Sequence, residues 1–247
     1  MSAVIIIPAR MGSSRLPGKA LQMIAGRPLI EQTWRAAMRS CLPVLIATDD
    51  DEIAAIASDF GAEVQMTGEC ANGTERCAKA VEKAGIKADI IINWQGDSPL
   101  CDPAWCQALI EALEDAPAAH VATPVQMMGA DQTRRWRADL DAGVKGATSA
   151  AVGRMNRAVY FSKTLLPADP GPWMHVGIYA YRRFALENYG FVAGPLEKAE
   201  GLEQLRWLEK GHFVRAVPVD ADPIWEVNNP GDIAIVEAVL ERRDATA

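Results

Sequence analysis

The first apolar run and the loop that follows it constrain the fold of this chain more than any other segment. Residues 4–7 read Val-Ile-Ile-Ile. A β-branched run of this kind predicts a strand buried on both faces, as in a parallel sheet covered by helices. The run stops at Pro8, and the next residues carry Arg10, Arg15 and Lys19. Because open α/β sheets bind ligands at the carboxyl ends of their strands, we predict a ligand site in this loop.

The residue types in the loop suit a polyanionic ligand. Glycines allow backbone N–H groups to approach an anion, and the three cations supply charge. The loop is not a Walker A motif, since five residues separate Gly12 from Gly18 and Ala20 follows Lys19. Each cation taken alone is better explained as a solvated surface charge. Their clustering directly after a buried strand favours a nucleoside triphosphate.

The composition limits the remaining function classes. The chain has 247 residues, 49% of them hydrophobic, and a net charge of −7, which argues against general nucleic-acid binding. No stretch approaches the ~20 apolar residues of a membrane span, so we expect no membrane insertion. Five cysteines without zinc-ligand spacing suit a reducing compartment, and we expect a cytoplasmic protein. We predict a single domain over residues 1–247, with an excursion at residues 126–190.

Hydrophobic periodicity predicts alternating strands and helices. The expected strands span residues 4–7, 44–48, 63–66, 89–94, 119–125, 157–162, 173–181, 213–219 and 226–229. The expected helices span residues 28–40, 52–60, 103–113, 183–189, 196–210 and 230–243, with another beginning near Thr74. Residues 126–156 show no pattern that places elements. The glutamates at 197, 200 and 203 fall at helical spacing, which is typical of a solvated face.

Two further groups of polar residues follow predicted strands. Gln95 and Asp97 come directly after the strand at 89–94, so an amide and a carboxylate should share a crevice with Lys19. Asp97 is the leading candidate for a Mg²⁺ ligand. An Asp that bonds its own turn before a proline is an equally good explanation of Asp97 alone. Thr74 is expected to cap a helix from which Arg76 points back toward the loop, the alternative being an exposed helix cation.

Four segments in order resemble the 3-deoxy-manno-octulosonate (Kdo) cytidylyltransferases. They read IIPARMGSSRLPGKAL, NGTERCAKAVEK, NWQGDSPL, and HVGIYAYR followed by PLEKAEGLEQLRWLEKG. The resemblance implies a three-layer α/β/α nucleotide-diphospho-sugar transferase (Rossmann-like) fold with a mostly parallel sheet and a small antiparallel excursion. It implies a homodimer and Mg²⁺-dependent transfer of CMP from CTP to the anomeric hydroxyl of Kdo, with release of pyrophosphate. It further implies a place in lipopolysaccharide biosynthesis.

The same resemblance assigns roles to individual residues. The catalytic set is Lys19, Arg15 and Asp97. The expected nucleotide contacts are Ala9, Arg10, Arg15, Lys19, Asn72, Thr74, Arg76 and Gln95. The expected contacts of the acid sugar are His175, Tyr179, Glu203 and Gln204. The expected metal ligands are Asp97, Asn228 and Glu226.

The chain also departs from the family pattern. Ser98 and Asn72 stand where the family usually has Glu and Ser, and Asn228 stands where its second magnesium-binding Asp is expected. Glu226, two residues earlier on the same predicted strand face, could replace that carboxylate. Three hypotheses remain: a Kdo cytidylyltransferase, a cytidylyltransferase for another 2-keto-3-deoxy or amino-modified acid sugar, and a non-catalytic nucleotide-binding relative.

Overall fold

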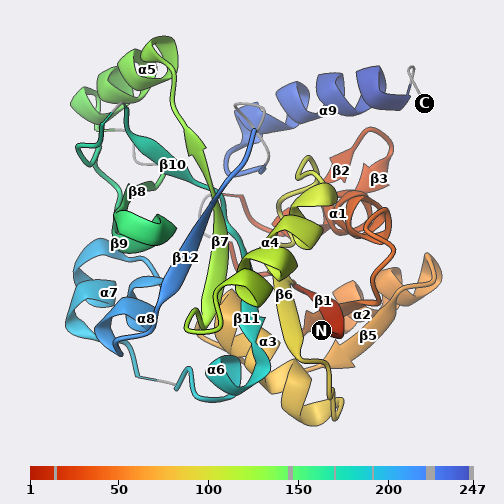
Figure 1. The fold of residues 1–247 in the computed structure, drawn as a ribbon. Coiled ribbons are helices and arrows are strands. Elements are labelled where there is room, and N and C mark those ends of the chain that lie inside the picture. The colour runs from red at the N-terminus through yellow and green to blue at the C-terminus, as the bar shows by residue number, and fades with distance from the viewer. Residues whose placement is uncertain (14–15, 144–146, 170, 191, 221–225, 245–247) are drawn as a thin grey trace. The chain divides into compact units, whose positions relative to one another are not determined.

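A computed structural model describes residues 1–13, 16–143, 147–169, 171–190, 192–220 and 226–244. The chain divides into two compact units, Met1–Gln107 with Ala221–Ala247 and Ala108–Asp220, which are described separately below (Figure 1). The described part of residues 126–190, the expected excursion, lies in the second unit. In the described chain, no helix has both the length and the apolar character that crossing a membrane requires.

The first unit contains four parallel strands in the order β6-β1-β4-β5. Their bounds are β1 Ala3–Pro8, β4 Val44–Thr48, β5 Glu63–Met66 and β6 Ile90–Trp94. Figure 1 shows β1 and β6 side by side. In the register of this pair, Ile6 lies opposite Asn93. Residues 5–7 are completely buried, as the β-branched run predicted. The parallel sheet expected from the sequence is therefore confirmed.

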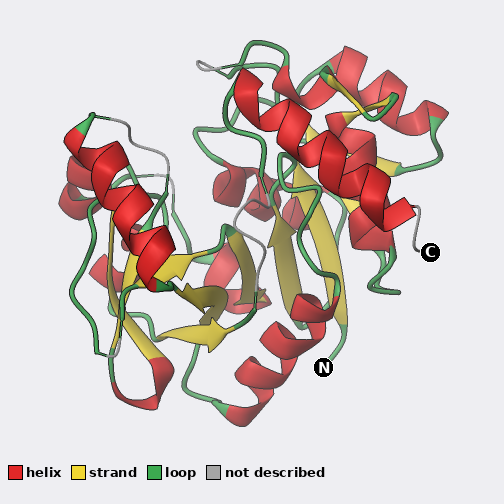
Figure 2. Cartoon of the chain, turned by 90° about the horizontal axis from the view of Figure 1, so that it is seen from above, coloured by secondary structure: helices red, strands yellow, loops and turns green. Residues whose placement is uncertain are grey.

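Helices connect and flank these strands (Figure 2). Helix α3 contacts all four strands, and α1 contacts β4. The helices are α1 Leu29–Met38, α2 Asp51–Asp59, α3 Gly73–Lys83, α9 Pro230–Asp244 and the short 3-10 helix η1 Lys19–Leu21. A small hairpin joins β2 Met23–Ile24 to β3 Arg27–Pro28. Helix α4, Ala104–Asp115, begins in the first unit and ends in the second.

The second unit is built mainly from antiparallel strands. Their order is β10-β8-β9-β12-β7-β11, and among the described residues of this unit only the β12–β7 pair runs parallel. The strands are β7 Val121–Met127, β8 Ser149–Val152, β9 Arg157–Ser162, β10 Trp173–His175, β11 Ile178–Arg182 and β12 Val214–Pro218. The helices are α5 Ala130–Asp141, η2 Arg154–Asn156, α6 Arg183–Glu187, α7 Pro195–Glu200 and α8 Leu205–Glu209. The predicted antiparallel excursion is confirmed.

Several predicted elements differ from the structure. The helix predicted at 196–210 is two helices, because Gly201 adopts a left-handed conformation with φ +65° and ends α7. The strand predicted at 173–181 is divided into β10 and β11. Residues 126–156, which showed no pattern, contain the end of β7, helix α5 and strand β8. Residues 226–229 form no strand in the described structure.

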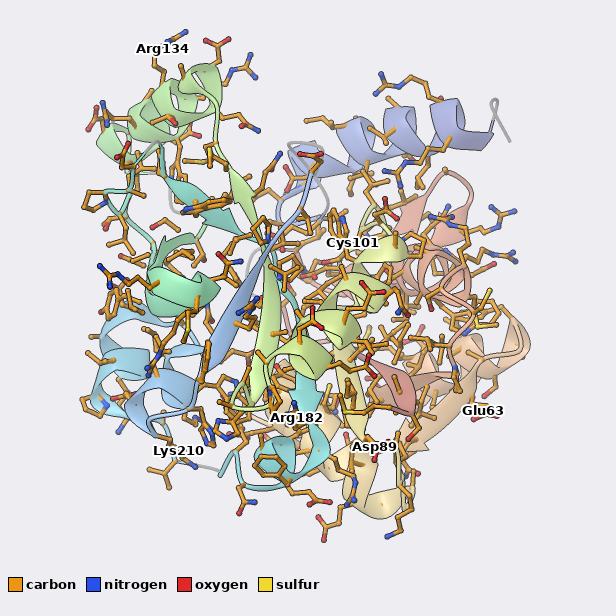
Figure 3. All side chains as sticks on the ribbon, in the orientation of Figure 1. Glu63, Asp89, Cys101, Arg134, Arg182 and Lys210 are labelled. Carbon is orange, nitrogen blue, oxygen red and sulfur yellow. The ribbon has the colours of Figure 1, made fainter. Side chains whose placement is uncertain are left out.

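Charged residues on α5 are exposed. Arg134, labelled in Figure 3, lies on the outside of α5 and pairs with Asp131. Arg135 and Arg137 are also exposed, whereas Trp136 is buried. The tryptophan therefore anchors α5 while the arginines face solvent.

Candidate functional site

The carboxyl ends of β1 and β6 approach each other closely because of Gly96. A Cβ added at Gly96 would lie 2.8 Å from the Pro8 carbonyl oxygen, closer than side-chain atoms can come. The Gly96 carbonyl accepts a hydrogen bond from Thr33 Oγ1 at 3.0 Å. The Ala9 N–H donates to the Ala47 carbonyl at 2.8 Å. Glycine at position 96 thus allows the two strand ends to form one ordered edge.

We expect Gly96→Ala to lower the free energy of unfolding by about 1–3 kcal/mol, because the added methyl group overlaps backbone rather than a movable side chain. Urea denaturation measures this change. Gly12→Ala is the matched control, since a Cβ there meets no atom of the described residues within 4 Å. Equal midpoints for the two variants would contradict the close approach at Gly96.

Lys19 joins the first loop to Asp97 and to the segment before α9. Its ammonium group forms an ion pair with Asp97 Oδ2 and donates to the Val227 carbonyl at 3.1 Å. The Val227 N–H donates to the Asp97 backbone carbonyl at 2.8 Å. The prediction that Asp97 lies beside Lys19 is confirmed. Asp97 does not serve merely to bond its own turn.

The side chains of Glu226 and Asn228 contact each other beside Val227. Asn228 Nδ2 donates to Glu226 Oε1 at 2.5 Å. The backbone N–H groups of Asn228 and Asn229 donate to Asp232 Oδ2, which fixes the start of α9. The predicted shared strand face is wrong, because this segment is held by capping bonds instead of a sheet. The two side chains nevertheless lie on one short segment bound to Asp97.

The pKa of the buried Cys101 thiol is sensitive to the negative charges in this region. Burial raises its pKa well above the ordinary range, and the charges of Glu226 and Asp97 raise it further. Cys101 lies just before α4, where Figure 3 labels it. A thiol held protonated in this way is unreactive. Two carboxylates therefore act on the same small region of the first unit.

The oxygen donors of this region fit a hard cation such as Mg²⁺. Asp97 and Glu226 offer carboxylate oxygens and Asn228 an amide oxygen, which are the ligand types that Mg²⁺ accepts. Within the part of the chain that the structure describes, no three His, Cys, Asp or Glu side chains gather closely enough to hold a metal by themselves. Such a site suits Mg²⁺ that shares its coordination with substrate phosphates and water.

The start of α3 is capped by Asn72, not by Thr74 as the sequence predicted. Asn72 Oδ1 accepts from the Glu75 N–H at 2.8 Å, and Glu75 Oε2 accepts from the Ala71 N–H at 3.1 Å. This reciprocal arrangement satisfies N–H groups at and just before the helix start. Thr74 is buried. Asn72, which stands where the family motif usually has Ser, therefore caps α3 in this chain.

Arg76 does not point toward the first loop. Its guanidinium is 2% exposed and donates to Thr67 Oγ1 at 2.7 Å and to Asp49 Oδ2 at 2.9 Å. It also donates to the Gly68 carbonyl. These partners follow β4 and β5, because α3 directs this position toward those strands. Arg76 holds strand ends together, which corrects the predicted direction.

The remaining residues of the first loop are only partly described. Arg10 is exposed, and Ala9 is buried at the end of β1. The Leu16 N–H donates to Ser13 Oγ at 3.4 Å. Arg15, predicted to be catalytic, lies outside the described residues. The exposed Arg10 is available to an anion at the edge of the sheet.

In the second unit, His175 is a buried neutral histidine beside Tyr179. His175 Nε2 lies 2.9 Å from Thr123 Oγ1, and its ring centroid lies 5.4 Å from that of Tyr179. Burial lowers the pKa of His175 to about 3. The Tyr179 ring stacks on Tyr181. The structure thus brings two of the four predicted sugar contacts together around an uncharged imidazole.

We expect the stability difference between wild type and His175→Gln to narrow as the pH falls from 7 toward 4. The folded pKa lies below the ordinary 6.5, so protons bind preferentially to the unfolded chain of the wild type between pH 6.5 and about 3. The wild type therefore loses stability as the pH falls, whereas the variant has no imidazole at this position and does not lose stability in this way. Urea titrations at several pH values measure the difference, and a constant difference would contradict a buried neutral His175.

Glu203 and Gln204 lie at the start of α8. The Glu203 carbonyl accepts from the Tyr189 hydroxyl at 3.2 Å, and Gln204 is buried. The solvated glutamate face predicted nearby is wrong. Glu197 is buried and forms a two-pronged ion pair with Arg206 at 2.6 and 2.7 Å, while Glu200 accepts from Ser162 Oγ at 3.0 Å. Both carboxylates therefore fix this segment rather than face solvent.

Sequence reasoning missed three polar residues that the fold buries, Arg206, Thr123 and Asn93. Arg206 lies nine residues from Glu197, and its guanidinium also lies 4.1 Å from the centre of the Tyr189 ring. Thr123 meets His175 from another strand. Asn93 is a buried amide within an apolar strand. Of these residues only Asn93 could have been identified from the sequence, because a polar side chain within an apolar strand requires a hydrogen-bonding partner.

Comparisons with known proteins match nearly the whole chain to cytidylyltransferases. The family model described as "Cytidylyltransferase" matches residues 4–217. The 3-deoxy-manno-octulosonate cytidylyltransferase of Maricaulis maris is 40% identical over 254 residues, 97% of each chain. That of Myxococcus xanthus is 40% identical over 251 residues, again 97% of each chain. A solved CMP:2-keto-3-deoxy-manno-octonic acid synthetase complexed with CTP is 34% identical with a TM-score of 0.85, covering 98% of this chain and 100% of that one.

Proposed function

Because this chain belongs to the cytidylyltransferase family, we propose that it transfers CMP from CTP to the anomeric hydroxyl of Kdo and releases pyrophosphate. The observation that carries the proposal is the cluster of Lys19, Asp97 and Val227 at the carboxyl ends of β1 and β6. It places a cation and a carboxylate where an open α/β sheet binds a nucleotide. The relatives named for this activity supply the substrate pair.

In this reaction the sugar hydroxyl attacks the α-phosphorus of CTP. A new P–O bond forms to the sugar, the bond to the bridging oxygen breaks, and pyrophosphate leaves with its electron pair. The hydroxyl proton is released. Lys19, Arg10 and Arg15 would neutralise the triphosphate and the charge on the departing pyrophosphate, which is how phosphoryl transfer is chiefly assisted. Asn72, Gln95 and Ala9 would contact the nucleotide at the same sheet edge.

Asp97, Glu226 and the Asn228 amide oxygen are the proposed ligands of a Mg²⁺ ion. When bound, the ion would neutralise phosphate charge and lower the pKa of the attacking hydroxyl. The oxygen-only donor set supports the assignment. Lys19 would hold Asp97 and the Val227 segment together, so that these oxygens stay near one another.

We expect Asn228→Asp to lower the Mg²⁺ concentration for half-maximal activity and Glu226→Gln to raise it. The new carboxylate would face Glu226 at hydrogen-bonding distance, so repulsion should lower the melting temperature in EDTA and added Mg²⁺ should restore it. Activity titrations and thermal melts with and without Mg²⁺ measure both effects. Asp131→Asn, an exposed carboxylate on α5, is the control. If both variants kept the wild-type Mg²⁺ requirement and melting temperatures, this segment would not be part of the metal site.

For the acid sugar we propose His175, Tyr179, Glu203 and Gln204 as contacts. Because His175 is neutral, it would recognise the sugar through hydrogen bonding rather than charge. We also propose a homodimer, on the resemblance alone, and a cytoplasmic location, on the cysteine composition. Sedimentation of the purified chain tests the dimer.

Pyrophosphate release with CTP, ATP, GTP and UTP, measured across a panel of 2-keto-3-deoxy sugar acids, tests the function. We expect the highest kcat/KM with CTP and Kdo. A higher value with another acid sugar would change the substrate but keep the reaction. No release with CTP and any sugar acid would overturn the proposal and favour a non-catalytic nucleotide-binding protein.

A further inference from the structure

Asn93 is a fully buried amide within an otherwise apolar strand. Its side chain is 0% exposed, as are those of Ile92 before it and Trp94 after it in β6. Moving an amide from water into such surroundings is unfavourable unless its polar atoms are hydrogen-bonded. A role in strand formation does not explain the residue, because Ile or Val would form β6 better.

Asn93 is hydrogen-bonded to Gln95, the amide proposed to contact substrate. Gln95 Nε2 donates to Asn93 Oδ1 at 3.1 Å. The two residues are separated by one position, so they point to the same side of the extended chain. The hydrogen bond selects one orientation of the Gln95 amide, in which Nε2 faces Asn93 and Oε1 remains the acceptor on the other side.

Gly73 confines the same amide from the start of α3. A Cβ added at Gly73 would lie 3.0 Å from Gln95 Oε1, 3.1 Å from Gln95 Nε2 and 3.2 Å from Pro8 Cγ. The amide therefore lies between a hydrogen-bonding partner on β6 and a helix start where even a Cβ atom would press against it. Its position is set by residues that need not touch substrate themselves.

We propose that Asn93 is a positioning residue for the transfer reaction, acting through Gln95. It holds the Gln95 amide in the one orientation that substrate binding requires, and Gly73 leaves the space for that orientation. This inference rests on the proposed function, in which Gln95 contacts a substrate at the carboxyl end of β6. Asn93 itself is completely buried, so its role would be exerted through Gln95.

A double-mutant cycle separates this role from a structural one. Asn93→Leu keeps the approximate size and removes the hydrogen-bonding group, and Gln95→Ala removes the amide that Asn93 positions. We expect Asn93→Leu to lower kcat/KM for CTP or for Kdo, each measured with the other saturating, by roughly tenfold, the effect of one lost hydrogen bond. In the Gln95→Ala background the same substitution should change kcat/KM by less than about twofold.

Gly73→Ala provides an independent arm that does not disturb the interior of β6. The added methyl group would displace the Gln95 amide, so we expect a similar loss that also disappears in the Gln95→Ala background. If Asn93→Leu fails to fold, Gly73→Ala still tests whether the orientation of the Gln95 amide controls activity. Urea denaturation of every variant identifies losses that come from instability.

The outcomes are distinct. Losses that are equal in the wild-type and Gln95→Ala backgrounds would overturn the positioning role, because the substitutions would then act independently of Gln95. Full activity in both Asn93→Leu and Gly73→Ala would overturn it as well. A wild type that releases no pyrophosphate with CTP would instead reject the proposed function.

Discussion

Lys19→Met is expected to lower kcat/KM for CTP by about 10²- to 10³-fold, the loss typical of removing one group that stabilises developing charge. The methionine keeps most of the length of the side chain but cannot neutralise phosphate. It also loses the contacts that Lys19 makes with Asp97 and with the Val227 carbonyl. Pyrophosphate release at varied CTP concentrations measures the loss.

The fold of the Lys19→Met variant should survive, because the ion pair is partly exposed and Asp97 can be hydrated. Lys83→Met, which removes an exposed lysine at the end of α3, is the matched control and should keep wild-type kinetics. Lys19→Arg retains the charge with a different donor geometry and should recover only part of the activity. Unchanged CTP kinetics in Lys19→Met would refute the assignment of this loop to the triphosphate.

Arg76→Met should lower the free energy of unfolding by about 3 kcal/mol, at the low end for a broken buried ion pair. The loss leaves Asp49 and Thr67 without their partner at the ends of β4 and β5. The decrease in the free energy of unfolding is limited because Asp49 is 26% exposed and water can reach its carboxylate. Urea denaturation measures the change.

Arg35→Met is the control for Arg76→Met. Arg35 forms an exposed ion pair with Glu31 on α1, a kind worth only about 0–1 kcal/mol. Adding Asp49→Asn to Arg76→Met should recover part of the lost stability, since the unpaired charge is then absent. A fully stable Arg76→Met with weakened CTP binding would show that Arg76 contacts nucleotide and not strand ends.

Much of the fold follows from local sequence pattern. The mainly apolar runs of β1, β4 and β6 identified the parallel strands because burial on both faces leaves no polar alternation. The meeting of Lys19 with Asp97 was also predictable, because both follow neighbouring parallel strands and such strands end at one edge. Topology here brought together residues that are 78 positions apart.

The sequence by itself determined the class of fold and the resemblance to Kdo cytidylyltransferases, and it predicted a loop suited to a polyanion, because these depend on short segments with strong periodicity or distinctive motifs. Only the tertiary structure decided where longer side chains find their partners. Arg76 pairs with Asp49, and Glu197 pairs with Arg206, because a buried charge is stable only where the fold supplies an opposite charge. The segment at 226–229 forms a capped loop and no strand. Asp232 accepts from the N–H groups of Asn228 and Asn229, and the Asp97 carbonyl accepts from that of Val227, so these groups need no neighbouring strand.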